Sequence, residues 1–264
     1  MRVNIFSINK FLLYFCTLAF ICCFFYSNKI YAYNCYAASN AGTVAPDNGT
    51  VCANKYIVPS TSGGGAKKLK NATHSGSDAY ITYQGEKYWF GETAGRKNIF
   101  TGQVVNFNRA FYNKRNFNAD IGYWDTSSAT VTSEMFKGAR NFNQDIGDWD
   151  LSKNKWFWGM FYNAKNFNQD ISGWNTGNAR SFSTMFAHAL KFNQDIGGWN
   201  TSKVTTMYQM FRNAKKFNQD IGGWDTSKVT DFTSMFLVAV DFNNGGSSNI
   251  NNWNVSKATK MRSM

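Results

Sequence analysis

Aspartates at a constant spacing are the side chains best placed to do chemistry together. They recur every 25 residues, at Asp120, Asp145, Asp170, Asp195 and Asp220. Carboxylates in series can ligate calcium, and paired carboxylates serve glycoside hydrolases as acid and nucleophile. A hydrolase needs two carboxyl groups in different environments, whereas this column repeats one environment. We therefore expect no metal and no cofactor, and keep calcium binding and a glycan-active enzyme as the less favoured alternatives.

Other catalytic arrangements are missing from the sequence. The two histidines, His74 and His188, are far apart along the chain. There is no HExxH, CxxC, GxSxG, P-loop or GxGxxG motif. These observations predict a protein that is not an enzyme.

Aromatic residues at two polar positions of a repeat are the candidate binding residues. Trp156 and Trp158 stand where the next copy carries Ser181 and Ser183. Exposed rings beside a cation could bind sugar rings or a protein surface. The alternative is that the rings fill gaps between adjacent helices. The candidate residues are Lys155, Trp156, Trp158, Tyr162 and Tyr208.

A 25-residue repeat must position all of these side chains. Its tryptophans are Trp124, Trp149, Trp174, Trp199 and Trp224, and Trp253 follows after an insertion around GGSSN. Its asparagines include Asn143, Asn168, Asn193 and Asn218. Asparagines in such a column are expected to hydrogen-bond the backbone of adjacent turns, which is a structural role. A period of this length is typical of a solenoid.

Each copy combines two patterns. In the copy that begins at Trp199, apolar residues from Val204 to Ala214 follow the three-and-four spacing of an amphipathic helix. The FNQDI stretch reads as a short strand, which must pair with the neighbouring copies. A lone copy is too small to fold, so stability must come from stacking. The predicted fold class is α/β, a leucine-rich-repeat-like solenoid of strand-loop-helix repeats with a small β-rich N-terminal cap.

The strings FNQDIGGWNTSKVTTMYQMF and FNQDIGGWDTSKVTDFTSMF resemble the repeats of BspA-like leucine-rich repeat surface proteins. The resemblance covers residues 99–264. It implies a leucine-rich-repeat-like fold at the cell surface and a role in adhesion or in binding host or neighbouring cells. The copy with LSKNKWFW at residues 151–158 and the insertion at residues 241–250 depart from the pattern.

The N-terminus reads as an export signal over residues 1–32. Arg2 and Lys10 precede or flank an apolar run from Phe11 to Tyr26, and Ala32 offers a small-residue cleavage site. An uncleaved membrane anchor is the alternative. Cleavage would leave only Cys35 and Cys52, which are expected to form a disulfide in an oxidising compartment, with two free thiols as the alternative.

Residues 33–98 differ from the repeats. The stretch AYITYQGEKYWFG alternates around Gln84 and Gly85 like a hairpin. We expect this segment to cap the first repeat of the solenoid at 99–264, whose last copy is incomplete. An independent binding module is the alternative.

Charge and export together narrow the class of partner. The chain has 28 Lys and Arg against 16 Asp and Glu, which gives a formal net charge of +12. A basic exported protein favours acidic surfaces, and nucleic acid is not expected. We predict a secreted or cell-surface, non-catalytic protein that binds a host or neighbouring-cell surface protein or an anionic glycan. It would meet a membrane only through an uncleaved signal, and a structural surface-layer component is the alternative function.

Overall fold

The computed structural model describes residues 80–83, 86–89, 101 and 104–264. Strands β1 (Tyr80–Tyr83) and β2 (Glu86–Trp89) pair antiparallel, with Tyr80 opposite Trp89 and Tyr83 opposite Glu86. The expected signal at residues 1–32, the expected disulfide between Cys35 and Cys52, and most of the expected cap lie outside the described residues. Among the described residues, no helix has the length and apolar character needed to cross a membrane.

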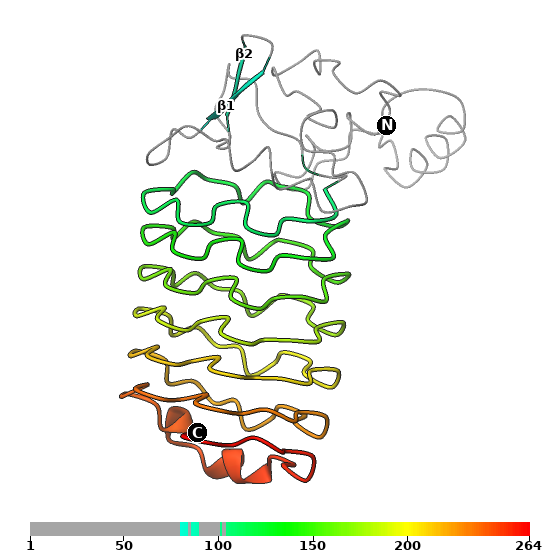
Figure 1. Cartoon of the computed structure of the whole chain (residues 1–264), viewed down its shortest axis with the longest axis vertical. Coiled ribbons are helices and arrows are strands. Elements are labelled where there is room, and N and C mark those ends of the chain that lie inside the picture. Colours follow the sequence, from blue (N-terminus) through cyan, green and yellow to red (C-terminus); the bar gives the residue numbers. More distant parts are fainter. Residues whose placement is uncertain (1–79, 84–85, 90–100, 102–103) are drawn as a thin grey trace, which may run out of the picture.

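From residue 104 onward, successive 25-residue copies lie one above another as flattened coils (Figure 1). The repeat tryptophans stack between coils, with ring centroids 6.2–6.4 Å apart in the pairs Trp124–Trp149, Trp174–Trp199 and Trp224–Trp253. From Trp149 onward, each ring also donates a hydrogen bond from Nε1 to an isoleucine carbonyl of the preceding coil, such as Trp199 to Ile171 at 3.1 Å. One side chain therefore supplies both apolar and polar contact between coils.

Each coil has two halves that face each other across the core. We call residues 104–116 and their equivalents the ladder half, which also comprises 129–141, 154–166, 179–191, 204–216, 229–241 and 258–264. We call residues 117–128 and their equivalents the return half, which also comprises 142–153, 167–178, 192–203, 217–228 and 242–257. Buried phenylalanines join the halves, as Phe161 stacks on Phe167 with centroids 4.0 Å apart. The outward side chains of the two halves therefore lie on opposite sides of the coil.

The structure differs from the sequence expectation in the segment expected to be helical, which forms consecutive turns. Residues 208–213 are turns, and Gln209 and Asn213 have positive φ angles of 52° and 55°. Their N–H groups donate to carbonyl groups of the next coil, at 2.9 and 2.8 Å. A helix would use such N–H groups internally, so hydrogen bonding between coils competes with it. Because left-handed residues recur four positions apart, the turns reproduce the spacing of an amphipathic helix.

The pairing between coils also lies elsewhere than expected. The FNQDI stretches contain no strand or bridge among the described residues, whereas Phe117, which begins the equivalent FNADI stretch of the first coil, forms a single bridge. Instead, the side chain of one asparagine accepts the backbone N–H of the next, as Asn193 Oδ1 accepts from Asn218 at 2.8 Å. The same contact links Asn118, Asn143, Asn168, Asn193, Asn218 and Asn243 in series. A side chain thus takes the acceptor role that a strand carbonyl would have.

The insertion before the last coil forms two short 3-10 helices, η3 (Asn244–Gly246) and η4 (Ser248–Asn252). Asn244 is buried, and its Oδ1 accepts the N–H of Ile221 at 2.9 Å. Its Nδ2 donates to Asp220 Oδ1 at 3.1 Å. These bonds hold the inserted residues against the preceding coil.

Candidate recognition surface

Parallel bridges connect the coils along one line of the ladder half. The bridged residues are Asn106, Val131, Trp156, Ser181, Thr206, Asp231 and Lys260. At Thr206, the residue before it donates its N–H to Arg180 of the previous coil, at 3.0 Å, and the residue after it donates to Asp231 of the next, at 2.9 Å. We call the outward side chains of this line and its neighbours, equivalent to residues 105, 106 and 108, the ladder face. Its backbone is bonded in both directions along the stack.

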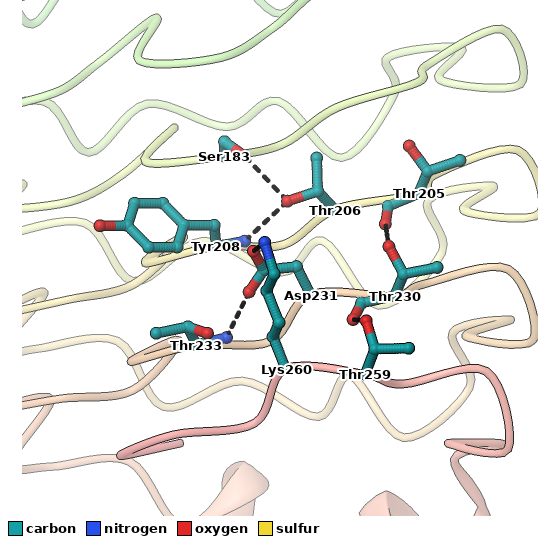
Figure 2. Close-up of polar contacts among 9 residues, drawn as sticks. All are labelled: Ser183, Thr205, Thr206, Tyr208, Thr230, Asp231, Thr233, Thr259 and Lys260. Carbon is teal, nitrogen blue, oxygen red and sulfur yellow. Dashed lines mark hydrogen bonds and ion pairs between the residues drawn. The ribbon is translucent and has the colours of Figure 1, made fainter.

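Threonines reinforce one edge of the ladder face. Thr205, Thr230 and Thr259 lie one below another in Figure 2, each in its own coil. Thr230 Oγ1 donates to the Thr205 carbonyl and Thr259 Oγ1 to the Thr230 carbonyl, both at 3.2 Å. These hydroxyls bond the same carbonyl groups that accept the backbone N–H groups of the ladder. The column therefore stiffens the face while its methyl groups stay exposed.

Short polar contacts hold the middle of the face (Figure 2). Ser183 Oγ lies 3.0 Å from Thr206 Oγ1, which also accepts the N–H of Tyr208 at 3.3 Å. Below them, Asp231 Oδ1 accepts the N–H of Thr233 at 2.9 Å, and Lys260 Nζ lies 3.9 Å from Asp231 Oδ2. These bonds fix the backbone from which the Tyr208 ring projects.

The structure brings together three of the five candidate binding residues. Lys155, Trp156 and Trp158 lie on one short segment, and Trp156 and Trp158 are 43% and 37% exposed on either side of buried Phe157. Tyr208 is 37% exposed in the same column as Trp158, two coils further on. Because the segment is bridged to both neighbouring coils at Trp156 and is not a helix, Trp156 and Trp158 point outward on either side of inward-facing Phe157.

Tyr162, the fifth candidate, lies apart from the ladder face, at the turn that ends the ladder half. It is half-buried, with Lys137 Nζ 5.0 Å from its ring centroid and the His188 ring 5.3 Å away. His188 Nδ1 contacts Asn213 Nδ2 at 2.9 Å. Burial lowers the pKa of His188, and the charges of Arg212 and Lys165 lower it further. Tyr162 therefore takes part in contacts between coils.

One buried carboxylate lies at this turn. Glu134 pairs with Arg109 of the preceding coil and with Lys137 of its own. The hydrogen bond from the Arg109 guanidinium to Glu134, together with its charge, raises the pKa of Arg109. Arg109 and Lys137 also lie over the Tyr112 ring, 5.2 and 5.6 Å from its centroid. Glu134 is thus fully committed to two cations of the stack.

The aspartate column lies in the return half, where the backbone satisfies each carboxylate. Asp120, Asp145, Asp170, Asp195 and Asp220 each accept the N–H of the residue two positions on, at 2.9–3.0 Å. The bonds from Ser172 hold the pKa of Asp170 below its usual value, and those from Gly222 and Ser247 do the same for Asp220. Within the described part of the chain, no three His, Cys, Asp or Glu side chains group as metal ligands would.

Charge divides sharply between the two halves. The ladder half carries fourteen Lys and Arg and only three carboxylates, Glu134, Asp231 and Asp241. The return half carries four lysines and nine aspartates. The two halves alternate along the chain, so this separation is invisible in the overall charge and emerges only when coils are stacked.

The sequence interpretation missed two features of this surface. One is Arg180, which follows Lys155 in an exposed column beside the aromatic residues. A helix would not place these two residues in one column next to the rings. The turn geometry had a usable signal, since the second left-handed position carries residue types that tolerate positive φ. These residues are Asn113, Gly138, Asn163, His188 and Asn213, whereas β-branched Val238 has a φ of 64° at the same position of the next coil and departs from the signal.

A family model described as "Mycoplasma protein of unknown function, DUF285" matches two overlapping segments, residues 89–197 and 170–264. Together these segments span all the coils. No curated protein and no solved structure matches the chain.

Proposed function

Because this chain belongs to the DUF285 family, whose description names no function, we propose a function from its surface: an exported, non-catalytic repeat protein that recognises other cells. The ladder face is the recognition surface. Its partner is a surface protein or glycan of a host or neighbouring cell, and the protein is secreted or held at the cell surface.

The observation that carries this proposal is the exposure of large rings on a rigid backbone. Trp156, Trp158 and Tyr208 leave the core intact, because Phe157 and its equivalents fill the interior beneath them. Exposed tryptophans are costly in water, and clusters of them mark binding sites. The ladder bonds hold these rings in place before a partner arrives, which reduces the entropy lost on binding.

Lys155 and Arg180 add charge to the same surface. Both are exposed in the column next to the rings, and the N–H of Arg180 donates to the Lys155 carbonyl at 2.9 Å. A cation beside an aromatic ring suits ligands that combine an apolar face with a negative group, such as acidic sugars or acidic protein loops.

The repeat also supports kinship with BspA-like surface proteins. We include two statements in the same proposal: that the protein is related to BspA-like surface proteins, and that the stacked coils form a leucine-rich-repeat-like solenoid. They rest on the repeat motif and its 25-residue period, and the family match concerns a repeat of the same general kind.

The proposal is tested by removing the Trp156 and Trp158 rings in a variant that still folds. The variant W156S/W158S should lose most binding of the purified protein to epithelial cells and to a glycan array, while its melting temperature stays within about 2 °C. The matched control V240S/V255S removes two other exposed apolar side chains and should bind normally. Retained binding by W156S/W158S with a lowered melting temperature would assign the rings to packing and refute the proposal.

A further inference from the structure

Cations that have no ion pair with a described residue recur at the turns that end the first five ladder halves. We call this set of residues the basic edge. Its members are Arg115, Arg140, Lys165, Lys191, Arg212 and Lys215. None of them makes an ion pair with a described residue, whereas nearby Lys216 pairs with Asp241 at 3.0 Å. The basic edge therefore carries positive charge that the described coils do not neutralise.

Stacking holds these cations at close, regular intervals. Arg115, Arg140 and Lys165 occupy one position in three consecutive coils. The coils are bonded at this point, since the Arg115 and Arg140 carbonyls accept the N–H groups of Asn141 and Asn166 at 3.0 and 3.1 Å. Hydrogen-bonded chains lie about 4.8 Å apart. Like charges on neighbouring coils repel one another, so an external anion bound along them would be stabilised.

The aspartates of the coils are already engaged. Each carboxylate of the main column in the return half is bonded to its own turn, and Asp231 and Asp241 of the ladder half pair with Lys260 and Lys216. The remaining carboxylate of the ladder half, Glu134, is buried and paired with Arg109 and Lys137. The counter-charge of the basic edge has to come from outside the coil stack.

We propose that the basic edge binds a linear anionic polysaccharide, one bearing carboxylate or sulfate groups, laid along the stack. Arg115, Arg140, Lys165 and Lys215 share one position of the coil, and Lys191 and Arg212 lie within three positions of it. The cations therefore follow the stacking direction, which suits an extended polymer better than the plane of a membrane. Each contact is weak, and the repeat multiplies it. This inference rests on the proposed function, because it names one class of partner for an exported recognition protein and places it beside the ladder face. Export also favours a polysaccharide over nucleic acid.

The experiment compares two triple variants of equal charge change. R115Q/R140Q/K165Q neutralises the basic edge in three coils, and K153Q/K228Q/K257Q neutralises three exposed lysines of the return half. Binding to immobilised heparin, hyaluronan and neutral dextran is measured from low to high salt, with random single-stranded DNA and phosphatidylglycerol vesicles as competing probes. Melting temperatures of both variants check the fold.

We expect heparin or hyaluronan to bind, neutral dextran not to bind, and affinity to fall as salt rises. The basic-edge variant should bind about tenfold more weakly, and the return-half variant within about twofold of the unmodified protein. The inference would be overturned by equal weakening in both variants or by absence of polysaccharide binding at low salt. It would also be overturned by salt-sensitive self-association that excludes the polymer, or by tighter binding of DNA or vesicles. Loss of polysaccharide binding with normal cell binding through Trp156 and Trp158 would leave the proposed function standing.

Discussion

The two halves of each coil use charge in opposite ways. In the return half, acidic side chains stabilise the fold. Eight of its nine aspartates accept a hydrogen bond from the backbone N–H of the residue two positions later. These include Asp125, Asp150 and Asp225 as well as the main column. In the ladder half, most of the Lys and Arg side chains make no ion pair with a described carboxylate.

The difference distinguishes side chains that are bonded within the fold from side chains that remain free to bind a partner. A carboxylate that accepts a turn N–H is part of the local backbone geometry, and its recurrence follows from the recurrence of the turn. An exposed lysine or tryptophan with no partner contributes nothing comparable to the fold. Regular spacing alone therefore does not identify function, because the most regular acidic column is the more structural one.

The largest effect is expected where the halves meet. Phe161 is fully buried and stacks on Phe167 of the return half and on Phe136 and Phe186 of neighbouring coils. F161A should lower the free energy of unfolding by about 3–5 kcal/mol, because it leaves a cavity between these three rings. Denaturant titration measures this loss. A change below about 1 kcal/mol would mean that the halves do not depend on this contact.

A smaller loss is expected from the asparagine column of the return half. Asn193 Oδ1 accepts from Asn218 N–H at 2.8 Å and from Gln219 Nε2 at 2.9 Å. N193A should cost about 1–3 kcal/mol, because a partly buried N–H loses its acceptor. N193D keeps an acceptor oxygen at this position and should retain most of the stability in the same titration. Equal losses in both variants would show that the hydrogen bond is not what matters.

In the ladder half, one substitution should stabilise the protein. Asn154 is fully buried in a column otherwise filled by Ala129, Ala179, Val204 and Val229. Its Nδ2 donates to Thr132 Oγ1 at 2.8 Å, but its Oδ1 has no hydrogen-bond partner among the described residues. N154V should raise the free energy of unfolding by about 1 kcal/mol. Destabilisation measured by urea titration would instead make Asn154 a required polar link beneath Trp156.

The smallest effect concerns pH and sharpens the contrast in the acidic half. Hydrogen bonds from serine N–H and hydroxyl groups lower the pKa of Asp170 and Asp225 in the folded protein. A lowered pKa stabilises the fold above the unfolded value, and this stability is lost as pH falls below about 4. The melting temperature should therefore fall more steeply from pH 5 to pH 3 in the unmodified protein than in D170N/D225N. Identical pH curves would remove these aspartates from the structural set.

Particular residues show how far the sequence could predict this molecule. The 25-residue period and its Trp column follow from spacing alone. For Trp156 and Trp158, spacing left two interpretations open, and the structure has both rings exposed. The predicted helix was wrong. Turns with a left-handed residue every fourth position place apolar side chains at the same spacing as a helix, so the pattern does not distinguish the two. The 25-residue spacing of Arg115, Arg140 and Lys165 does not by itself predict the basic edge, since its significance depends on which carboxylates the backbone has already used. That information exists only in three dimensions.

The most direct test of the account adds the same charge to each half and measures adhesion. T205E/T230E places two carboxylates on the exposed ladder face, and G198E/G223E places two in the open space around exposed glycines of the return half. The account predicts that the ladder-face variant binds epithelial cells several-fold less, while the return-half variant binds like the unmodified protein. Equal loss in both, or loss only in the return-half variant, would contradict it.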